Sequence, residues 1–234
     1  MSRILIVDDE PRLLRALQIA LQALRHSVVT AANGPDALDE AAGTPPDAII
    51  LDLGLPGPDG IDILRALRVW STVPVIVLSG RTGEQEKIAA LDAGADDYLT
   101  KPFSMNELLA RLRVVLRRPL AEPTPGGSAV FGDYTVDLAG CTVRWTHGAA
   151  HDPGERPAVR LSPTEWRMLT VLIQHPGRLV TAQQILLSVW GPGHDDKTNY
   201  LRVYLAALRR KLEPDPAHPR HLITEPGMGY RFEP

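Results

Sequence analysis

Cysteine is scarce in this 234-residue sequence: only Cys141 is present, which excludes an internal disulfide. A lone cysteine usually behaves as a small hydrophobe, so we expect Cys141 to be buried rather than reactive. The seven histidines show no metal-ligand spacing. No apolar run is long enough to cross a bilayer, and the N-terminus lacks a signal-peptide pattern. We therefore expect a cytoplasmic protein that does not contact a membrane.

Net charge is also small, at −3, which taken alone argues against binding to nucleic acid. The charge is nevertheless uneven along the chain. Residues 1–118 contain 16 acidic and 13 basic side chains, whereas residues 129–234 contain 11 acidic and 12 basic ones. The length suits two modest domains, each able to bury a core. We therefore expect two domains, with the acidic surplus in the first.

The N-terminal part alternates apolar runs with segments of helical length. The runs rich in Val, Ile and Leu are ILIV, SVVTA, AIILDL, VPVIVLS and DYLT. In the first helical segment Leu14, Leu17, Leu21 and Leu24 recur at three- and four-residue steps, which predicts one buried helix face. Nearly continuous apolar strands are typical of a parallel sheet covered by helices on both faces. This pattern predicts a doubly wound, flavodoxin-like α/β domain over residues 1–118.

The C-terminal part has a different pattern. Residues 119–128 are rich in Pro and Gly and predict a linker. Short alternating strands follow, separated from the rest by a polar loop at 146–157 that is rich in turn residues. Two capping boxes then begin short helices, at Ser162 with Glu165 and at Thr181 with Gln184. A third helix and a terminal hairpin complete an α+β winged helix-turn-helix domain over 129–234.

Polar residues stand where the strands of the first domain end. Asp8 and Asp9 follow strand one, Asp52 lies near the end of strand three, Ser79 ends strand four and Lys101 follows strand five. Ligands of doubly wound sheets bind beyond these strand ends, so we expect the five side chains to converge. Each alone has an ordinary explanation, such as a helix cap or a surface charge. Together, three carboxylates predict a Mg²⁺ site, with Asp52 as a nucleophile toward a phosphoryl group.

The segments VDDE, LDLGLPGPDG, VIVLSGR and GADDYLTKPF resemble the receiver domain of bacterial response regulators. The resemblance implies phosphorylation of Asp52 by a sensor histidine kinase and a Mg²⁺ site of Asp8, Asp9, Asp52 and the Gly54 carbonyl. It further implies that Lys101 precedes a cis bond to Pro102 and contacts the phosphoryl group, and that Ser79 and Tyr98 form a switch pair. Tyr98 taken alone is more simply explained as an ordinary strand residue. Gly80 departs from the family, in which a small alkyl residue is usual, and predicts a short-lived phosphoryl group.

The segments LSPTEWRMLTVLIQHPGRLVT, VWG, LRVYLAALRRKLE and GMGYRF resemble the winged-helix effector of the OmpR/PhoB class. Five basic and no acidic residues lie between Lys197 and Leu212. On an isolated helix they would favour a solvated basic face, but beside two capped helices and a Gly-containing hairpin they favour insertion into a DNA groove. The resemblance implies these DNA contacts: Asn199, Arg202, Val203, Tyr204, Arg209, Arg210 and Arg231. Two longer stretches, LRVWSTVPVIVLSGR and PRHLITEPGMGYRF, resemble the regulators of potassium-transport operons within this class.

The same resemblance implies a homodimer that forms on phosphorylation and binds direct repeats in double-stranded DNA, with RNA polymerase as a further partner. Its interface would use three charged pairs: Lys87 with Glu107, Asp97 with Arg111, and Asp96 with Arg118. We expect no enzyme beyond slow self-dephosphorylation at Asp52. Two alternatives remain at this point: a phosphatase with an aspartyl-phosphate intermediate, and a receiver that acts through protein contacts only.

Overall fold

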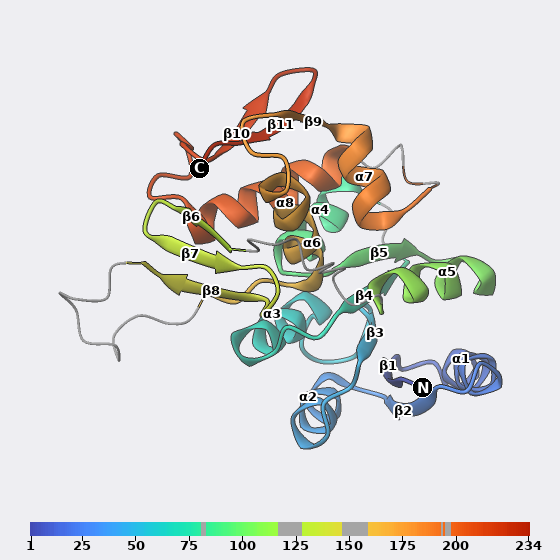
Figure 1. The fold of residues 1–234 in the computed structure, drawn as a ribbon. Helices are drawn as coiled ribbons and strands as arrows, with labels where there is room; N and C mark the ends of the chain where they lie inside the picture. Colours follow the sequence, from blue (N-terminus) through green and yellow to red (C-terminus); the bar gives the residue numbers. More distant parts are fainter. Residues whose placement is uncertain (81–82, 117–127, 147–158, 193, 195–197) are drawn as a thin grey trace. The chain divides into compact units, whose positions relative to one another are not determined.

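The computed structural model describes residues 1–80, 83–116, 128–146, 159–192, 194 and 198–234. The chain divides into two compact units, Met1–Arg118 and Pro119–Pro234 (Figure 1). Most of the predicted linker, residues 119–127, lies outside the described residues, and Ser128 is already the first residue of a strand. Of the predicted 146–157 loop, only Thr146 lies within them.

The first unit contains a five-stranded parallel sheet in the order β2-β1-β3-β4-β5. The strands are β1 (Arg3–Val7), β2 (Ser27–Ala31), β3 (Ala48–Asp52), β4 (Val75–Ser79) and β5 (Asp97–Thr100). In β1, β3 and β4 nearly every residue is buried, as expected for strands covered on both faces. The predicted flavodoxin-like sheet is confirmed.

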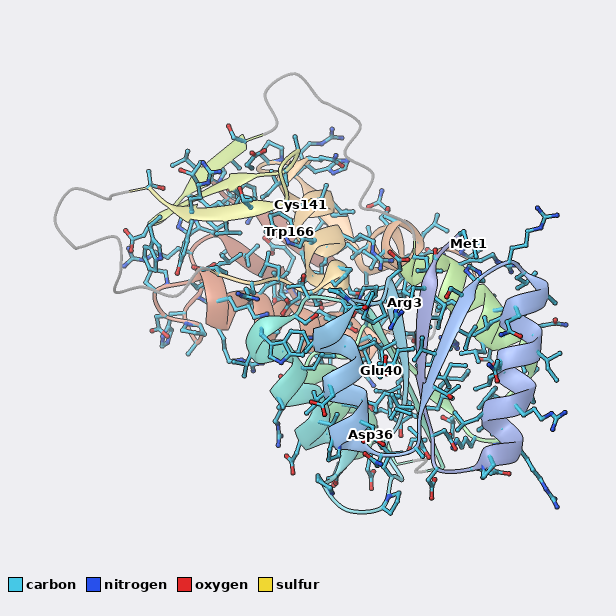
Figure 2. The ribbon with its side chains drawn as sticks, turned by 90° about the horizontal axis from the view of Figure 1, so that it is seen from below. Met1, Arg3, Asp36, Glu40, Cys141 and Trp166 are labelled. Carbon is cyan, nitrogen blue, oxygen red and sulfur yellow. The ribbon has the colours of Figure 1, made fainter. Side chains whose placement is uncertain are left out.

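Five helices cover this sheet: α1 (Pro11–Ala23), α2 (Gly34–Gly43), α3 (Gly60–Trp70), α4 (Glu84–Asp92) and α5 (Met105–Val115). The helices α1 and α5 share one core with the sheet, through side chains such as Leu17, Leu21, Leu108 and Leu112. On α2, Glu40 binds Arg3 of β1 at 3.2 Å, and Figure 2 labels both residues. Leu24 differs from the prediction, because α1 ends at Ala23 and the Leu24 side chain is exposed.

The second unit begins with an antiparallel meander of β6 (Ser128–Phe131), β7 (Tyr134–Asp137) and β8 (Thr142–Trp145). Three helices follow: α6 (Pro163–Ile173), α7 (Ala182–Trp190) and α8 (Thr198–Leu212). A second sheet contains β10 (Leu222–Glu225), β11 (Gly229–Phe232) and β9 (Leu179–Thr181), in that order. The capping boxes before α6 and α7 and the terminal hairpin are confirmed. The sequence did not indicate β9, which has only three residues.

Cys141 lies in the turn between β7 and β8, and the prediction that it is buried is wrong. The turn requires a left-handed backbone there, with φ of 48°, and places the side chain at the surface. The thiol donates to the Leu138 carbonyl at 3.7 Å. Partial burial, helped by the charge of Asp137, raises the pKa of the Cys141 thiol, which disfavours the reactive thiolate.

Candidate functional site

Three carboxylates meet at the carboxyl ends of β1 and β3. Asp8 directly follows β1 and is fully buried, Asp52 is the last residue of β3 and is 5% exposed, and Asp9 is exposed. Each offers an oxygen within 4.8 Å of the other two. The strands β1 and β3 are neighbours and parallel, so the register of the sheet itself brings their ends together. The convergence predicted for these acids is confirmed.

Lys101 joins this cluster from the end of β5. Its Nζ donates to Asp8 Oδ2 at 2.8 Å and to Asp52 Oδ2 at 2.9 Å. Burial alone would lower the pKa of Lys101, but the hydrogen bonds and charges of Asp8 and Asp52 outweigh burial and raise it above its usual value. The peptide bond to Pro102 is cis, as expected. Lys101 is therefore a fixed ammonium between two buried carboxylates.

The remaining predicted receiver residues surround this edge. Ser79 ends β4 and is buried, and the Lys101 N–H donates to its carbonyl at 2.7 Å. Tyr98 of β5 is also buried, with its ring centroid 6.0 Å from Lys87 Nζ. At Gly54 a side chain would begin 3.3 Å from Asp52 Oδ2, whereas at Gly80 an added Cβ would meet no atom within 4 Å. A side chain at Gly54 would thus crowd the Asp52 carboxylate.

The chemistry of the donor set suits a hard divalent cation. Three carboxylates in close contact supply the oxygen ligands that Mg²⁺ prefers, and an exposed Asp9 leaves room for the waters that this ion retains. Asp8 is held in place because its Oδ1 accepts the Glu10 N–H at 2.9 Å. The residues therefore fit Mg²⁺.

Three residues from two of the predicted dimer pairs, Arg111, Asp97 and Glu107, interact within one chain. Arg111 of α5 donates through Nη1 to both carboxylate oxygens of Asp97, at 3.0 and 2.8 Å, and through Nη2 to Glu107 at 2.7 Å. Both Arg111 and Asp97 are largely buried, with side-chain exposures of 12% and 2%. An Asp97–Arg111 contact between subunits would have to share or replace this bond.

Asp96 is the least accessible of the predicted interface residues. It is fully buried, and its carboxylate accepts from Arg68 of α3 and from the Val75 N–H, both at 3.0 Å. The sequence analysis did not identify Arg68 as its partner. Arg118, the predicted partner of Asp96, lies outside the described residues. The structure thus assigns Asp96 a contact inside the subunit, and its proposed role between subunits is the least supported of the three pairs.

The residues predicted to contact DNA divide into two groups on α8. Asn199, Arg202 and Arg210 are exposed. Tyr204 is 1% exposed, with its ring 5.5 Å from that of Trp190, and Val203 is 9% exposed. The prediction that Tyr204 and Val203 point toward DNA is therefore wrong for this structure.

The two other predicted DNA contacts are bound within the unit. Arg209 donates to the Leu222 carbonyl and to Thr224. Burial lowers the pKa of Arg209, and the charge of Glu213 opposes this effect. Arg231 on β11 pairs with Glu225 of β10 and with Glu233. Arg231 stays partly exposed, at 36% of its side chain, so it remains accessible from solvent.

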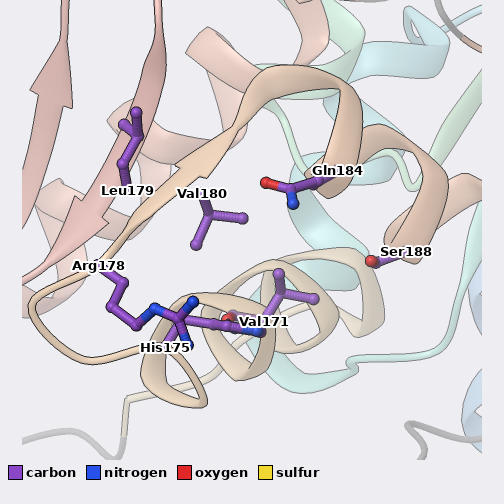
Figure 3. A pocket seen from close by; sticks show the side chains of 7 residues that line it. All are labelled: Val171, His175, Arg178, Leu179, Val180, Gln184 and Ser188. Atoms are coloured by element: carbon purple, nitrogen blue, oxygen red, sulfur yellow. The ribbon is translucent and has the colours of Figure 1, made fainter.

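A groove of about 240 Å³ lies within the second unit, between α6, β9 and α7. Figure 3 shows Val180 and Gln184 pointing into it, with His175 and Arg178 at one end. None of its lining residues is acidic or belongs to α8 or to the β10–β11 hairpin. Its possible nucleophile and base, Ser188 and His175, lie at opposite ends of the groove (Figure 3).

Comparison with known families decides the identity of the two units. Residues 4–113 match the model of the response regulator receiver domain, and residues 154–232 match that of the transcriptional regulatory protein C-terminal domain. The chain is a response regulator. It is 54% identical, over the full length of both proteins, to the "Transcriptional regulatory protein KdpE" of Mycobacterium tuberculosis. It is 51% identical, over 99% of each chain, to the "KDP operon transcriptional regulatory protein KdpE" of Escherichia coli.

Solved structures agree with this assignment. Response regulator DrrB of Thermotoga maritima, described as an OmpR/PhoB homolog, aligns over the whole of both chains with 29% identity and a TM-score of 0.51. A RitR mutant covers 100% of this chain with 25% identity and a TM-score of 0.77. This response regulator is thus of the OmpR/PhoB type. Its second domain favours transcriptional regulation over both a phosphatase and a receiver that acts through protein contacts only.

Within the described residues of this response regulator, no helix has the length and apolar character needed to cross a membrane.

The sequence located the acidic cluster, because its residues follow strands that periodicity reveals. It did not reveal the pairing of Arg68 with Asp96, since those residues lie on elements distant in the chain. The contacts of Arg209 were also missed, because a basic residue on a helix is by itself typical of a DNA contact.

Proposed function

We propose that this response regulator accepts a phosphoryl group from a sensor histidine kinase on Asp52 and thereby controls binding of its second domain to DNA. The observation that carries the proposal is the meeting of Asp8, Asp9, Asp52 and Lys101 at one edge of the sheet. The sheet brings these strand ends together, but it does not require each end to carry a charged side chain. Their combination of carboxylate nucleophile and fixed ammonium suits phosphoryl transfer.

In the transfer step an oxygen of Asp52 attacks phosphorus, and the bond from phosphorus to the donor's histidine nitrogen breaks. The electron pair of that bond leaves with the imidazole. Mg²⁺, held by Asp8, Asp9, Asp52 and the Gly54 carbonyl, would neutralise charge on the transferring oxygens. Lys101, already beside Asp52, donates to a phosphoryl oxygen, and the Ser79 hydroxyl donates to another. Tyr98 then fills the space behind Ser79, which links the phosphoryl group to the α4-β5-α5 surface.

We place the dimer on that surface, with Lys87–Glu107 and Asp97–Arg111 as its pairs and Asp96–Arg118 as a weaker candidate. Individual surface pairs contribute about 0–1 kcal/mol, so only the set can stabilise a dimer. Arg111 already binds Asp97 within the chain, so a contact across the dimer would add little new ion pairing. This favours a weak dimer that phosphorylation can switch.

The dimer would present two copies of α8 to direct repeats about one helical turn apart. We assign base and nearby backbone contacts to Asn199 and Arg202, phosphate contact to Arg210, and a minor-groove contact to Arg231. All four belong to elements whose other faces are buried in the second domain. The dimer bound to DNA in this way would recruit RNA polymerase to the promoter.

The relatives named for the KDP operon support a potassium-transport operon as the target. We further propose that the protein works in the cytoplasm, where the operon and the polymerase are. Turnover at Asp52 would be limited to slow loss of its own phosphoryl group. The groups beside Asp52, namely Asp8, Asp9 and Lys101, are all assigned here to Mg²⁺ and to the phosphoryl group, which agrees with a switch rather than an enzyme.

The experiment compares genome-wide DNA binding by wild type and Asp52→Asn, with and without a small phosphodonor such as phosphoramidate. We expect the donor to increase binding at a potassium-transport operon for wild type but not for Asp52→Asn. Asp39→Asn, the same substitution at an exposed position on α2, is the control and should behave as wild type. A phosphate-affinity gel in which Asp52→Asn is still retarded would overturn the assignment of Asp52.

A further inference from the structure

A carboxylate at the end of α8 holds the start of the wing, the β10–β11 hairpin. Glu213 follows the last residue of α8 and is 7% exposed. Its Oε1 accepts the N–H groups of His221 at 2.9 Å and Leu222 at 2.7 Å, and its Oε2 accepts that of Arg220 at 3.0 Å. Negative charge is disfavoured at the carboxyl end of a helix. The three backbone N–H donors offset the unfavourable interaction of the Glu213 carboxylate with the end of the helix. The carboxylate therefore stabilises the start of the wing rather than α8.

A guanidinium one turn earlier on α8 binds the same strand. Arg209 Nε donates to the Leu222 carbonyl at 2.8 Å, and Arg209 Nη2 donates to Thr224 Oγ1 at 2.7 Å. Both backbone polar groups of Leu222 are thus bound by side chains of the α8 segment, and the Leu222 side chain is fully buried. β10 is an edge strand, so its outward peptide groups need partners other than a strand.

The wing also lies close to the exposed face of α8. Burial raises the pKa of Tyr230 on β11, and the charges of Arg202 and Arg209 oppose that rise. Arg202 is therefore near the strand that carries Arg231. One rigid connection between α8 and the wing would fix the relative positions of the two residues that we assign to DNA.

We propose that Arg209 and Glu213 are positioning residues that hold the wing in a fixed position relative to α8. Arg202 on α8 and Arg231 on the wing would then contact one DNA duplex as a single rigid surface. This inference rests on the proposed function, and it replaces the prediction that Arg209 contacts phosphate. A flexible wing would have to be ordered on binding, and that cost would cancel most of the contribution of Arg231.

A double-mutant cycle separates positioning from simple stabilisation. Full-length wild type, Glu213→Gln, Arg231→Ala and the double variant are titrated, after treatment with phosphoramidate, against a duplex carrying the strongest genomic site. Loss of Arg231 from wild type should weaken binding about tenfold, as expected for one lost contact. Glu213→Gln alone should weaken it by a similar factor. With Glu213→Gln already present, removing Arg231 should cost less than about twofold.

Two further variants control for charge and folding. Arg209→Lys keeps the positive charge but loses the planar fork that reaches Leu222 and Thr224 together, so it should behave as Glu213→Gln does. Asp215→Asn removes an acid whose hydrogen-bond partners in the described part of the chain, Ala217 and His218, belong to its own loop, and it should leave affinity unchanged. Amide exchange at Leu222 should become at least about tenfold faster in Glu213→Gln, because its N–H loses the carboxylate partner.

Each outcome decides the proposal. If the effects of Glu213→Gln and Arg231→Ala multiply to about a hundredfold, Glu213 has a structural role only and the inference is wrong. If Arg209→Lys binds like wild type, Arg209 is not a positioning residue. If Arg231→Ala has no effect even in the wild-type background, the assignment of the wing to DNA fails, and the proposal fails with it. Loss of phosphorylation-dependent binding by wild type itself would instead overturn the proposed function.

Discussion

Replacing Lys101 with methionine tests the physical basis of the acidic cluster most directly. Lys101 is the cation that the structure places between Asp8 and Asp52, at 2.8 and 2.9 Å. Methionine keeps most of the side-chain volume and removes the charge. Without the ammonium, two buried carboxylates and a third exposed one face each other in magnesium-free buffer.

The magnitude follows from the separations. Two unit charges no more than 4.8 Å apart repel by at least about 3 kcal/mol at an effective dielectric constant near 20. Breaking a fully buried ion pair from one side costs about 3–5 kcal/mol. The Lys101 side chain is 25% exposed, so water screens part of this effect. We therefore expect a loss of about 2–3 kcal/mol from the first domain, or a midpoint lower by about 10 °C.

Magnesium should reverse most of that loss. An ion present at 100 times its dissociation constant stabilises the folded state by about 2.7 kcal/mol. In wild type Mg²⁺ competes with Lys101 for Asp8 and Asp52, whereas in the variant it meets unpaired carboxylates. The shift of the midpoint with Mg²⁺ should therefore be larger for Lys101→Met than for wild type.

The same contacts determine the pH range in which the effect of Lys101 can be measured. Hydrogen bonds and charges of Asp8 and Asp52 raise the pKa of Lys101 despite its burial. A lysine with a raised pKa contributes stability that is complete below its unfolded pKa, about 10.4, and is lost as the pH rises through the folded value. At pH 7 the full difference between wild type and variant should be present, and it should shrink as the pH rises through the raised pKa of Lys101.

The assay is thermal unfolding of the full-length chain by calorimetry, in EDTA and in a Mg²⁺ series, following the transition that Mg²⁺ shifts. Lys87→Met is the control, since Lys87 lies over the Tyr98 ring rather than between carboxylates. It should unfold near the wild-type midpoint. Equal midpoints for Lys101→Met and wild type in EDTA, with equal responses to Mg²⁺, would refute the idea that this edge is a strained anionic site.

Three further predictions follow from single positions. Gly80→Ala should lengthen the lifetime of the phosphoryl group on Asp52, since an added Cβ there meets no atom and would only cover the site; a shorter lifetime in a dephosphorylation time course would contradict this. Tyr204→Ala should destabilise the second domain by about 3–5 kcal/mol in urea unfolding, as for a buried aromatic ring, and an unchanged midpoint with altered sequence preference would restore Tyr204 as a DNA contact. Arg202→Ala should reduce discrimination between operator and random DNA, whereas Arg210→Ala should weaken both equally and lower the salt slope by about one; equal effects of the two would remove the distinction.

The sequence by itself determined the elements whose signals are local. Strands of Val, Ile and Leu, capping boxes and the alternation of strand and helix depend on neighbours within one turn or one strand, so periodicity reveals them. The acidic cluster was predictable for the same reason. Asp8, Asp52 and Lys101 each stand at a strand end, and a parallel sheet brings such ends together whatever the details of packing.

Only the tertiary structure decided how side chains of one element meet the next. Leucines recur at helical spacing in α8, at Leu201, Leu205, Leu208 and Leu212, and predict one buried face. The helix packs against both α6 and α7, however, so Tyr204 and Val203 are buried as well. Cys141 became exposed because a turn required its backbone to be left-handed. Arg209 and Glu213 bind a strand that begins at residue 222. Such contacts depend on where distant segments meet in space, and a one-dimensional pattern carries no information about that distance.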